Sequence, residues 1–397
     1  MAKFRTIKGG RSDDQAPDDY RSKLKKHRAM NAYRTMLFIV LILVLILIIY
    51  ARFRSHVYTG YEVLNSYERN VPDSQRDIRL GQSILSYSHD GAHCIDAEGK
   101  TVWDQGYEMQ DIRVSVCGGT VAIASYNGRD VYILNEKEKL GSFKTNFPIR
   151  DVAVAENGRV SVVLNGGDST LINTYSPAGD LLYSGQMHMS GSGYPVSLAL
   201  SPAGNLLCVS FIYVDAGTVK STVAFYNLTE VGDNYTDFLV SSYDYTDLVV
   251  PEVGFLNDST AYAVGDERFM IYKGAEQPES LGEHLISDEI RSVYTGNGYF
   301  GLVFRSSDPD VRYRMDVYDA GDNLVGKYDI DFEYTDVLFE DSDLVIYNES
   351  SCIIYTYRGK VKFDDSFRTG VRLMISTDKA YRYVLSTSSS VDTIRLN

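Results

Sequence analysis

The stretch SILSYSHDGAHCIDAEGKTVW, residues 83–103, decides the fold class of this chain. It holds three short runs rich in β-forming residues, and the turn sequences His-Asp-Gly and Ala-Glu-Gly separate them. Runs of this length bounded by such turns predict antiparallel strands. The stretch therefore predicts the second, third and fourth strands of a four-stranded unit without a convincing first strand.

The same pattern repeats along the rest of the chain. Strand-like runs alternate with Gly, Asp and Asn turns every eight to twelve residues. The first strands of successive units begin at Ile112, Val152, Val196, Val249, Ile290, Tyr334 and Val371. Neighbouring starts lie 37 to 44 residues apart, apart from one interval of 53. Because a blade of a β-propeller takes about 40–45 residues, the period predicts an all-β propeller.

The two ends of the repeat complement each other. Residues 371–397 provide a first, second and third strand without a fourth, and YEVLNSY, residues 61–67, is a strand without a unit. Pairing the two closes the ring and removes an exposed sheet edge. This assignment gives eight blades, and seven remain open if residues 61–67 do not close the ring.

Glycines follow the third strand of several units. Tyr-x-x-Gly or Asp-x-x-Gly sequences predict a positive φ angle in the turn between the third and fourth strands. The glycines concerned are Gly99, Gly179, Gly321 and Gly359. The long unit contains a tyrosine-rich insertion, residues 227–247, which we expect to project as a loop.

An apolar run precedes the repeat. Residues 36–51, MLFIVLILVLILIIYA, carry no charge and would span about 24 Å as a helix, close to the ~30 Å core of a bilayer. We predict a transmembrane signal anchor over residues 35–54. A cleaved signal peptide is the alternative, but RFRSHVY follows the run instead of a small-x-small cleavage site.

Charge is distributed unevenly around the apolar run. The net charge of −14 divides into +8 for residues 1–54 and −22 for the remainder. The flank before the run, residues 21–34, has six Lys and Arg residues, and the flank after it, residues 52–70, has three. This difference favours a cytoplasmic N-terminus. We expect a basic, disordered cytoplasmic tail (1–34), the helix (35–54), a linker with the closing strand (55–76) and an extracytoplasmic propeller (77–397). An acidic domain repels nucleic acid, so nucleic-acid binding is not expected.

Motifs of catalysis and cofactor binding are missing from the sequence. It has no GxSxG elbow and no Gly-rich phosphate loop. Trp103 is the single tryptophan and is expected to pack in a fourth strand rather than against a quinone cofactor. His89 and His93 straddle a turn, and the pairs Asp308/Asp310, Asp329/Asp331 and Asp341/Asp343 lack the pattern of an EF-hand. We assign no catalytic, cofactor or metal residue, and expect no cofactor.

The four cysteines are too few for a disulfide framework in a chain of this size. Each lies in or beside an apolar strand pattern, so we expect buried free thiols. A bridge between Cys94 and Cys117, on neighbouring strands, is the alternative.

Tyrosine provides the candidate binding residues. The chain has 31 tyrosines, most of which alternate within strands and are expected to pack in the core. Tyr226, Tyr235, Tyr243 and Tyr245 cluster in or beside the insertion. Exposed aromatic side chains there would suit a protein or glycan partner.

The residues resemble two known groups of proteins. HDGAHCIDAEGKTVW resembles the blade motif of quinoprotein-like and WD-repeat-like propellers. Nearly the whole chain resembles a family of single-pass membrane proteins of Gram-positive anaerobic bacteria that is classed as a domain of unknown function. The matching stretches are the basic tail with its anchor, YSHDGAHCIDAEGKTVW, NFPIRDVAVAENG, GYPVSLALSPAGNLLCVS, VAFYNL and TIRLN. The resemblance implies a propeller fold and an envelope location, and it supplies no activity.

These observations predict a membrane-tethered, extracytoplasmic propeller that acts as a non-enzymatic binding, scaffold or sensory module. The alternative is an envelope polysaccharide hydrolase or lyase that uses carboxylates in the propeller channel. Clustered carboxylates with strongly perturbed pKa values would favour the enzyme, and aromatic patches would favour the binding module.

Overall fold

The computed structural model describes residues 16–54, 56–72, 74–187, 193–309 and 311–397. The chain divides into two compact units, Met1–Val57 and Tyr58–Asn397. The first contains a single helix within its described residues, and the second contains all the strands.

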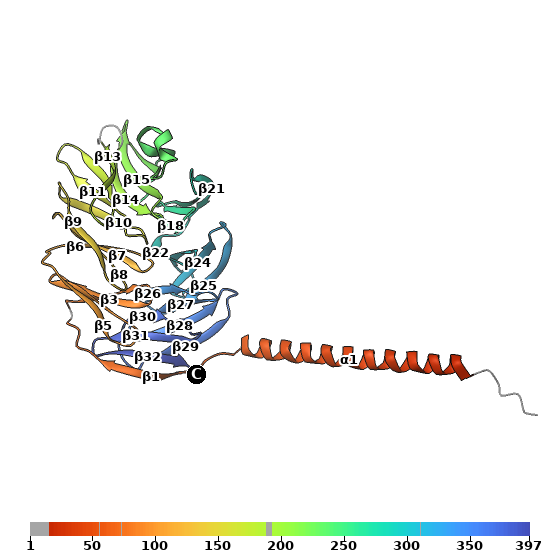
Figure 1. The fold of residues 1–397 in the computed structure, drawn as a ribbon. Coiled ribbons are helices and arrows are strands. Elements are labelled where there is room, and N and C mark those ends of the chain that lie inside the picture. The colour runs from red at the N-terminus through yellow and green to blue at the C-terminus, as the bar shows by residue number, and fades with distance from the viewer. Residues whose placement is uncertain (1–15, 55, 73, 188–192, 310) are drawn as a thin grey trace, which may run out of the picture. The chain divides into compact units, whose positions relative to one another are not determined.

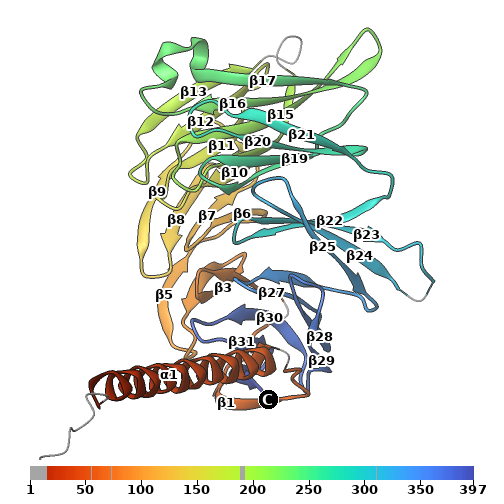
Figure 2. The same cartoon turned by 90° about the vertical axis from the view of Figure 1, so that its right-hand side faces the viewer.

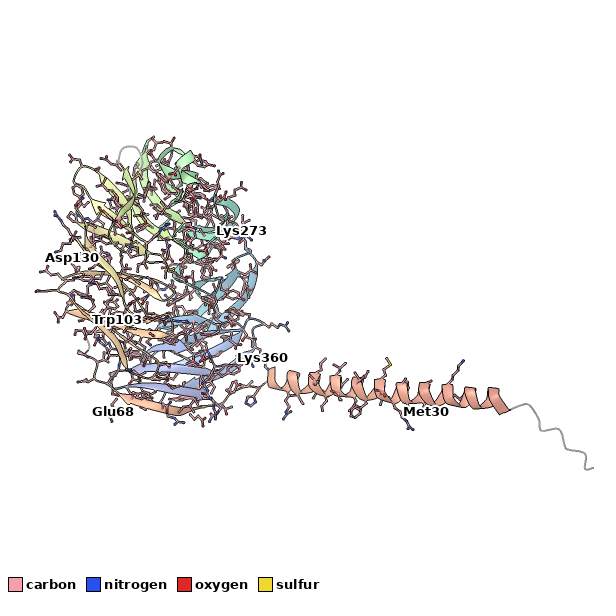
Figure 3. The ribbon with its side chains drawn as sticks, in the orientation of Figure 1. Met30, Glu68, Trp103, Asp130, Lys273 and Lys360 are labelled. Atoms are coloured by element: carbon pink, nitrogen blue, oxygen red, sulfur yellow. The ribbon has the colours of Figure 1, made fainter. Side chains whose placement is uncertain are left out.

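Helix α1 spans Ala16–Arg54, 39 residues. Its segment Ala29–Ile49 is long and apolar enough to cross a membrane, and its side chains are exposed, as Met30 shows in Figure 3. Residues 16–34, part of the tail for which the sequence predicts disorder, are helical. Lys, Arg, Leu, Met and Ala dominate residues 23–34, and their high helix propensity extends the apolar helix backwards. Residues 1–15 lie outside the described residues.

The second unit is a ring of eight antiparallel four-stranded sheets. Figures 1 and 2 show the sheets following one another around the unit in chain order. Blade 1 comprises β2 (Arg76–Leu80), β3 (Ser83–Ser88), β4 (Gly91–Ile95) and β5 (Thr101–Gly106). Blade 2 comprises β6 (Ile112–Cys117), β7 (Thr120–Ser125), β8 (Asp130–Asn135) and β9 (Lys139–Lys144). Blade 3 comprises β10 (Ile149–Val154), β11 (Val160–Asn165), β12 (Thr170–Tyr175) and β13 (Leu181–Met187). Blade 4 comprises β14 (Tyr194–Leu200), β15 (Leu206–Asp215), β16 (Thr218–Asn227) and β17 (Leu239–Thr246).

The second half of the ring repeats the same order of strands. Blade 5 comprises β18 (Glu252–Asn257), β19 (Thr260–Val264), β20 (Arg268–Lys273) and β21 (Glu279–Leu285). Blade 6 comprises β22 (Ile290–Gly296), β23 (Tyr299–Arg305), β24 (Tyr313–Asp319) and β25 (Leu324–Ile330). Blade 7 comprises β26 (Asp336–Phe339), β27 (Asp343–Tyr347), β28 (Ser351–Thr356) and β29 (Val361–Ser366). Blade 8 comprises β30 (Val371–Ser376), β31 (Arg382–Thr387), β32 (Ser390–Leu396) and, from the other end of the chain, β1 (Tyr61–Glu68).

Strand β1 closes the ring. It pairs antiparallel with β32, from Tyr61 opposite Leu396 to Glu68 opposite Ser390, and the two strands lie side by side in Figure 1. Both the eight-blade count and the closing strand are therefore confirmed. The hydrogen bonds of this pairing use the edge groups that an unclosed ring would expose.

The first strand of blade 1 is the element that the sequence pattern misses. Strand β2, RDIRL, has two apolar residues among five, so no apolar run marks it. Its Asp77 is buried because it forms a salt bridge with Arg69, and the Asp77 side chain has no exposed surface. One partner of a buried ion pair thus lies in this first strand, where the sequence shows no apolar run.

Three of the four predicted turn glycines have a positive φ angle. Gly99, Gly179 and Gly359 have φ angles of 77°, 89° and 79°. Gly321 does not, because Asp322 takes the left-handed position in its turn with a φ angle of 66°. Asp is one of the few residues with a side chain that tolerates this conformation.

The core lies between neighbouring blades. Eight clusters of buried side chains fill the space between sheets, and tyrosines are among the largest fully buried residues. Trp103 lies in the fourth strand of blade 1 (Figure 3), where its indole N–H donates to the Asn135 carbonyl at 2.8 Å. All four cysteines are free, and only Cys117 is partly exposed. The expectation of free thiols is confirmed, and no Cys94–Cys117 bridge forms.

The insertion in blade 4 is shorter than the sequence predicts. Only residues 228–238 leave the blade, in two short 3-10 helices, η1 (Gly232–Asn234) and η2 (Thr236–Phe238). Residues 239–246 form the fourth strand, β17, which pairs with β16. The expectation of a loop is wrong for this half, which forms a strand with two buried residues, Val240 and Tyr245.

Candidate functional sites

The four candidate tyrosines lie in different surroundings. Tyr243 and Tyr245 are in strand β17, where their hydroxyls bond to Pro278 O at 2.9 Å and to the Tyr272 hydroxyl at 2.7 Å. These contacts join blades 4 and 5. Tyr226 is buried at the end of β16, with 6% of its surface exposed, and Tyr235 is 39% exposed. Only Tyr235 has the exposure that the sequence hypothesis assumed for all four.

A groove runs along the outer edge of blades 3 and 4, beneath the insertion. Its volume is about 700 Å³. Five consecutive residues of β13, 183–187, form one wall, and Leu239, Ser242 and Asp244 of β17 belong to the other. Both strands are the outermost of their sheets. The groove thus lies beside the free backbone edge of β13.

Aromatic side chains line the deeper part of this groove. Tyr183 and Tyr226 have ring centroids 5.8 Å apart, and Phe238 packs edge-on against Tyr183 at 5.5 Å. The Tyr183 hydroxyl is buried and has no hydrogen-bond partner among the described residues. Burial raises the pKa of both tyrosines far above the ordinary value. The hydroxyl of Tyr183 is therefore a neutral donor and acceptor with unused capacity, which a bound ligand can satisfy.

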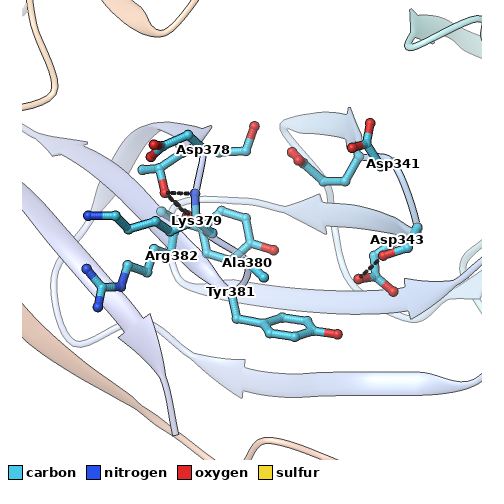
Figure 4. Close-up of a pocket in the computed structure, with 12 residues that line it drawn as sticks. Asp341, Asp343, Asp378, Lys379, Ala380, Tyr381 and Arg382 are labelled. Atoms are coloured by element: carbon cyan, nitrogen blue, oxygen red, sulfur yellow. Dashed lines mark hydrogen bonds between the residues drawn. The ribbon is translucent and has the colours of Figure 1, made fainter. Parts of the chain in front are cut away.

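A small acidic pocket lies where the turns after the first strands of blades 7 and 8 meet (Figure 4). Its volume is about 250 Å³. Figure 4 shows Asp341 and Asp343 facing the turn that carries Asp378 and Lys379. Burial raises the pKa values of Asp343 and Glu340. The negative charges of Asp341 and Asp343 raise the pKa of Glu340 further. The pocket combines carboxyl groups with pKa values displaced towards neutrality.

Three further buried carboxyls belong to the first strands of separate blades. Burial raises the pKa of Asp151 in blade 3, Glu252 in blade 5 and Asp336 in blade 7. Each accepts a local hydrogen bond, such as the one from Tyr262 to Glu252 at 3.1 Å. No carboxyl of this trio contributes to the pKa shift of another.

The histidines and acidic pairs singled out in the sequence do not converge. His89 contacts the Met109 carbonyl at 3.0 Å, whereas His93 contacts the Gln75 side chain at 3.1 Å. Among the described residues no group of three His, Cys, Asp or Glu side chains could hold a metal ion. Of the acidic pairs, Asp341/Asp343 lines the acidic pocket, and Asp310 lies outside the described residues.

A ring of eight blades closed by an N-terminal strand defines the class of this protein as an eight-bladed β-propeller with one N-terminal apolar helix. The chain belongs to the family of unknown function DUF5711, whose model matches residues 54–396. A family of unknown function was expected from the sequence, as was the propeller.

Solved structures share the fold at low sequence identity. BamB from Moraxella catarrhalis superposes with a TM-score of 0.50 and 10% identity, over 85% of this chain and 100% of that chain. Hsv2 from Kluyveromyces lactis gives a TM-score of 0.47 and 10% identity, over 81% of this chain and 99% of that chain. The comparison with curated proteins yields no match. The likeness to BamB supports the fold alone.

Proposed function

We propose that this protein is a membrane-tethered, extracytoplasmic binding module that holds an extended segment of an envelope protein in the groove between blades 3 and 4. The observation that carries the proposal is the groove itself, which lies beside the free edge of β13 and has an aromatic floor. An extended peptide can add to such an edge as a further strand, and its side chains can fill the pockets alongside.

The alternation of side chains along β13 suits this mode of binding. Tyr183, Gly185 and Met187 are buried towards blade 4, while Ser184 and Gln186 are exposed. Gly185 is required at the centre of the strand, because the Tyr183 side chain lies over it and a Cβ atom there would be 2.4 Å from the Tyr183 hydroxyl. Asp237 and Asp244 line the outer part of the groove, so we expect a segment with basic residues.

The anchor and its direction belong to the same proposal. The apolar segment Ala29–Ile49 has the length of a membrane span, and the six Lys and Arg residues within residues 21–34, against three within residues 52–70, favour a cytoplasmic N-terminus. The propeller then lies outside the cytoplasm. A reporter enzyme that is active only outside the cytoplasm should be active when it is fused after Asn397. Activity of a reporter that works only in the cytoplasm, fused at the same position, would contradict this orientation.

Site-specific crosslinking in cells tests the groove. A photoreactive residue replaces Ser242, which lines the groove, or Thr246, which is exposed on the same strand outside it. We expect a discrete protein adduct from position 242 and none from position 246. Thr222→Trp should remove the adduct, because Thr222 is a partly exposed residue of blade 4 that lines the groove, and an indole there obstructs it. Identical adducts from both positions, or an adduct that survives Thr222→Trp, would show that the groove is not the binding site.

A second candidate function rests on the acidic pocket. Glu340 and Asp343 have raised pKa values in a shared pocket, and a carboxylic acid beside a carboxylate can hydrolyse glycosidic bonds. If the protein is an envelope polysaccharide hydrolase or lyase, the full chain releases new reducing ends from cell-wall polysaccharide, and Glu340→Gln abolishes the release. Release that persists unchanged in Glu340→Gln and Asp343→Asn would exclude these residues from catalysis.

A further inference from the structure

Three arginines occupy the beginnings of the inner strands of three successive blades. Arg76 is the first residue of β2, while Arg113 and Arg150 are the second residues of β6 and β10. First strands start at the same end of each blade because the blades repeat one another. The three guanidinium groups are therefore brought to one face of the ring, although 74 residues separate Arg76 from Arg150 in the sequence.

Two clefts connect these arginines. Arg76 and Arg113 line a cleft of about 280 Å³ together with Tyr87 and His89. Arg113 also lines a second cleft of about 440 Å³ with Arg150. Because Arg113 belongs to both, the clefts adjoin, and we refer to them together as the arginine cleft.

Tyr126 holds two of the guanidinium groups in place. The Cζ atoms of Arg113 and Arg150 lie 4.6 Å and 5.8 Å from the centre of its ring. Arg150 Nη1 also donates to Asn127 Oδ1 at 2.6 Å. The ladder between β10 and β11 shifts register between Ile149 and Asp151, which leaves Arg150 unpaired in a bulge. A bulge re-aims its side chain, so the backbone itself directs Arg150 towards the cleft.

None of the three arginines has a carboxylate within 4.0 Å among the described residues. Elsewhere in the described propeller some exposed arginines pair with a carboxylate, as Arg312 does with Glu333, whereas others, such as Arg305, do not. The cleft differs because it brings three such arginines together, although the chain after residue 54 has 49 acidic and 27 basic residues. An unpaired cluster of guanidinium groups in an acidic domain is the arrangement that an oxyanion ligand requires.

Two carboxyl groups do line the cleft, Asp111 and Asp151. Burial raises the pKa of Asp151, although the Val152 N–H and Arg113 oppose the shift. Its negative charge is thus disfavoured, which weakens it as a competitor for Arg113. Asp111 is exposed and is available to accept hydrogen bonds from a polar ligand.

We propose that the arginine cleft binds a small saccharide that carries an oxyanion group, a phosphate or a carboxylate, with Arg113 and Arg150 as the principal contacts of that group. Guanidinium forks match both oxyanions in geometry. The rings of Tyr87, Tyr126 and Tyr194 and the hydroxyls of Ser74 and Ser88 line the same clefts. Aromatic faces and hydroxyls are the groups that a sugar ring stacks on and bonds to.

The size and the charge of the unit favour a small ligand over a long polymer. The volumes of the two clefts lie in the range of sites for single small molecules. The net charge of −22 after residue 54 repels a polyanion that extends beyond the cleft. This site lies apart from the groove between blades 3 and 4 and does not depend on the function proposed for it.

Three sugars that differ at one position test the proposal. Glucose 6-phosphate, glucuronate and glucose are titrated by calorimetry into the full chain in neutral detergent at low salt. We expect at least one of the two anions to bind tenfold or more tightly than glucose, and the ranking of the two assigns the oxyanion. Raised salt should weaken the preference. Equal affinity for all three sugars, or no measurable binding of either anion, would overturn the proposal.

Variants locate the site. Arg113→Ala and Arg150→Ala should each weaken binding of the preferred anion about tenfold or more, because each removes a charged hydrogen-bond donor. Arg113→Lys should lose part of this affinity, because it keeps the charge without the fork. Arg312→Ala is the matched control, an exposed arginine outside the cleft. If the two cleft variants bind as the control does while all of them melt as the parent does, the site lies elsewhere.

Discussion

Removing the carboxylate of Asp77 should destabilise the propeller more than any exposed charge substitution. Asp77 accepts hydrogen bonds from Ser86 at 2.5 Å and from Ser386 at 2.6 Å, and it pairs with Arg69. Ser386 belongs to blade 8, whereas Asp77 and Ser86 belong to blade 1. Arg69 follows the closing strand β1. One carboxylate thus links the last blade to the first at the closure of the ring.

The magnitude follows from the burial of the pair. The side chains of Arg69 and Asp77 are 11% and 0% exposed, and Nε and Nη1 of Arg69 are buried without a hydrogen-bond partner among the described residues. Asp77→Ala would leave a buried guanidinium without its counter-charge. Breaking a buried ion pair in this way costs about 3–5 kcal/mol.

The fluorescence of Trp103 offers a direct measurement. It is the single tryptophan, it is partly buried in blade 1, and its indole bonds to blade 2. Urea unfolding of the full chain in detergent, followed at this residue, should show a free energy of unfolding lower by about 3–5 kcal/mol in Asp77→Ala.

Two variants control this experiment. Glu333→Ala breaks an ion pair whose side chains are 58% and 68% exposed, and should change stability by at most about 1 kcal/mol. Arg69→Met combined with Asp77→Ala removes both charges and should be less destabilised than Asp77→Ala alone. A loss below about 1 kcal/mol in Asp77→Ala would refute the role assigned to this pair.

Three further outcomes are expected. Burial raises the pKa of Asp336 in the folded state above its ordinary value. At a pH above the folded-state pKa, ionisation of Asp336 opposes folding; at a pH below the ordinary carboxyl pKa, Asp336 is protonated in both states and this cost is absent. Asp336→Asn should therefore raise the melting temperature at pH 7.5 and lose this advantage near pH 4; an equal effect at both values would contradict it. Gly99→Ala should lower the free energy of unfolding by about 1–3 kcal/mol, because φ is 77° and the new Cβ would lie 2.7 Å from Cβ of Tyr67. An unchanged midpoint of urea unfolding would show that this turn does not require glycine. Burial raises the pKa of Cys117 to about 11 and also raises that of Cys208, so maleimide at pH 8 should label both slowly until urea is added, and rapid native labelling would argue against this burial.

Local pattern accounts for the parts of the fold that were predicted. The turn glycine Gly99 and the strand YEVLNSY, residues 61–67, follow from neighbouring residues, and both are confirmed. The strand β2 was missed because its inward positions include Asp77, whose burial depends on Arg69 and on blade 8. A charge that is neutralised by a distant partner leaves no apolar signal in the sequence.

The candidate sites depend even more than the fold on contacts between residues that are distant in the sequence. Sequence alone placed Tyr243 and Tyr245 together with Tyr235, but the partners that bury the first two, Pro278 and Tyr272, come from the next blade. The groove and the arginine cleft were not predicted. Each is assembled from residues of two or more blades, and the repeat period does not reveal which side chains meet between them.

The amino-acid sequence by itself determined the apolar helix, the repeat and the complementary ends, and it favoured a closed ring of eight blades, because strand alternation, turn chemistry and hydrophobic length act over a few residues. The tertiary structure alone decided which tyrosines are buried, which acids are desolvated and which arginines converge without a carboxylate partner. Those properties depend on contacts between blades, where burial and the loss of solvent set the energy of each polar group.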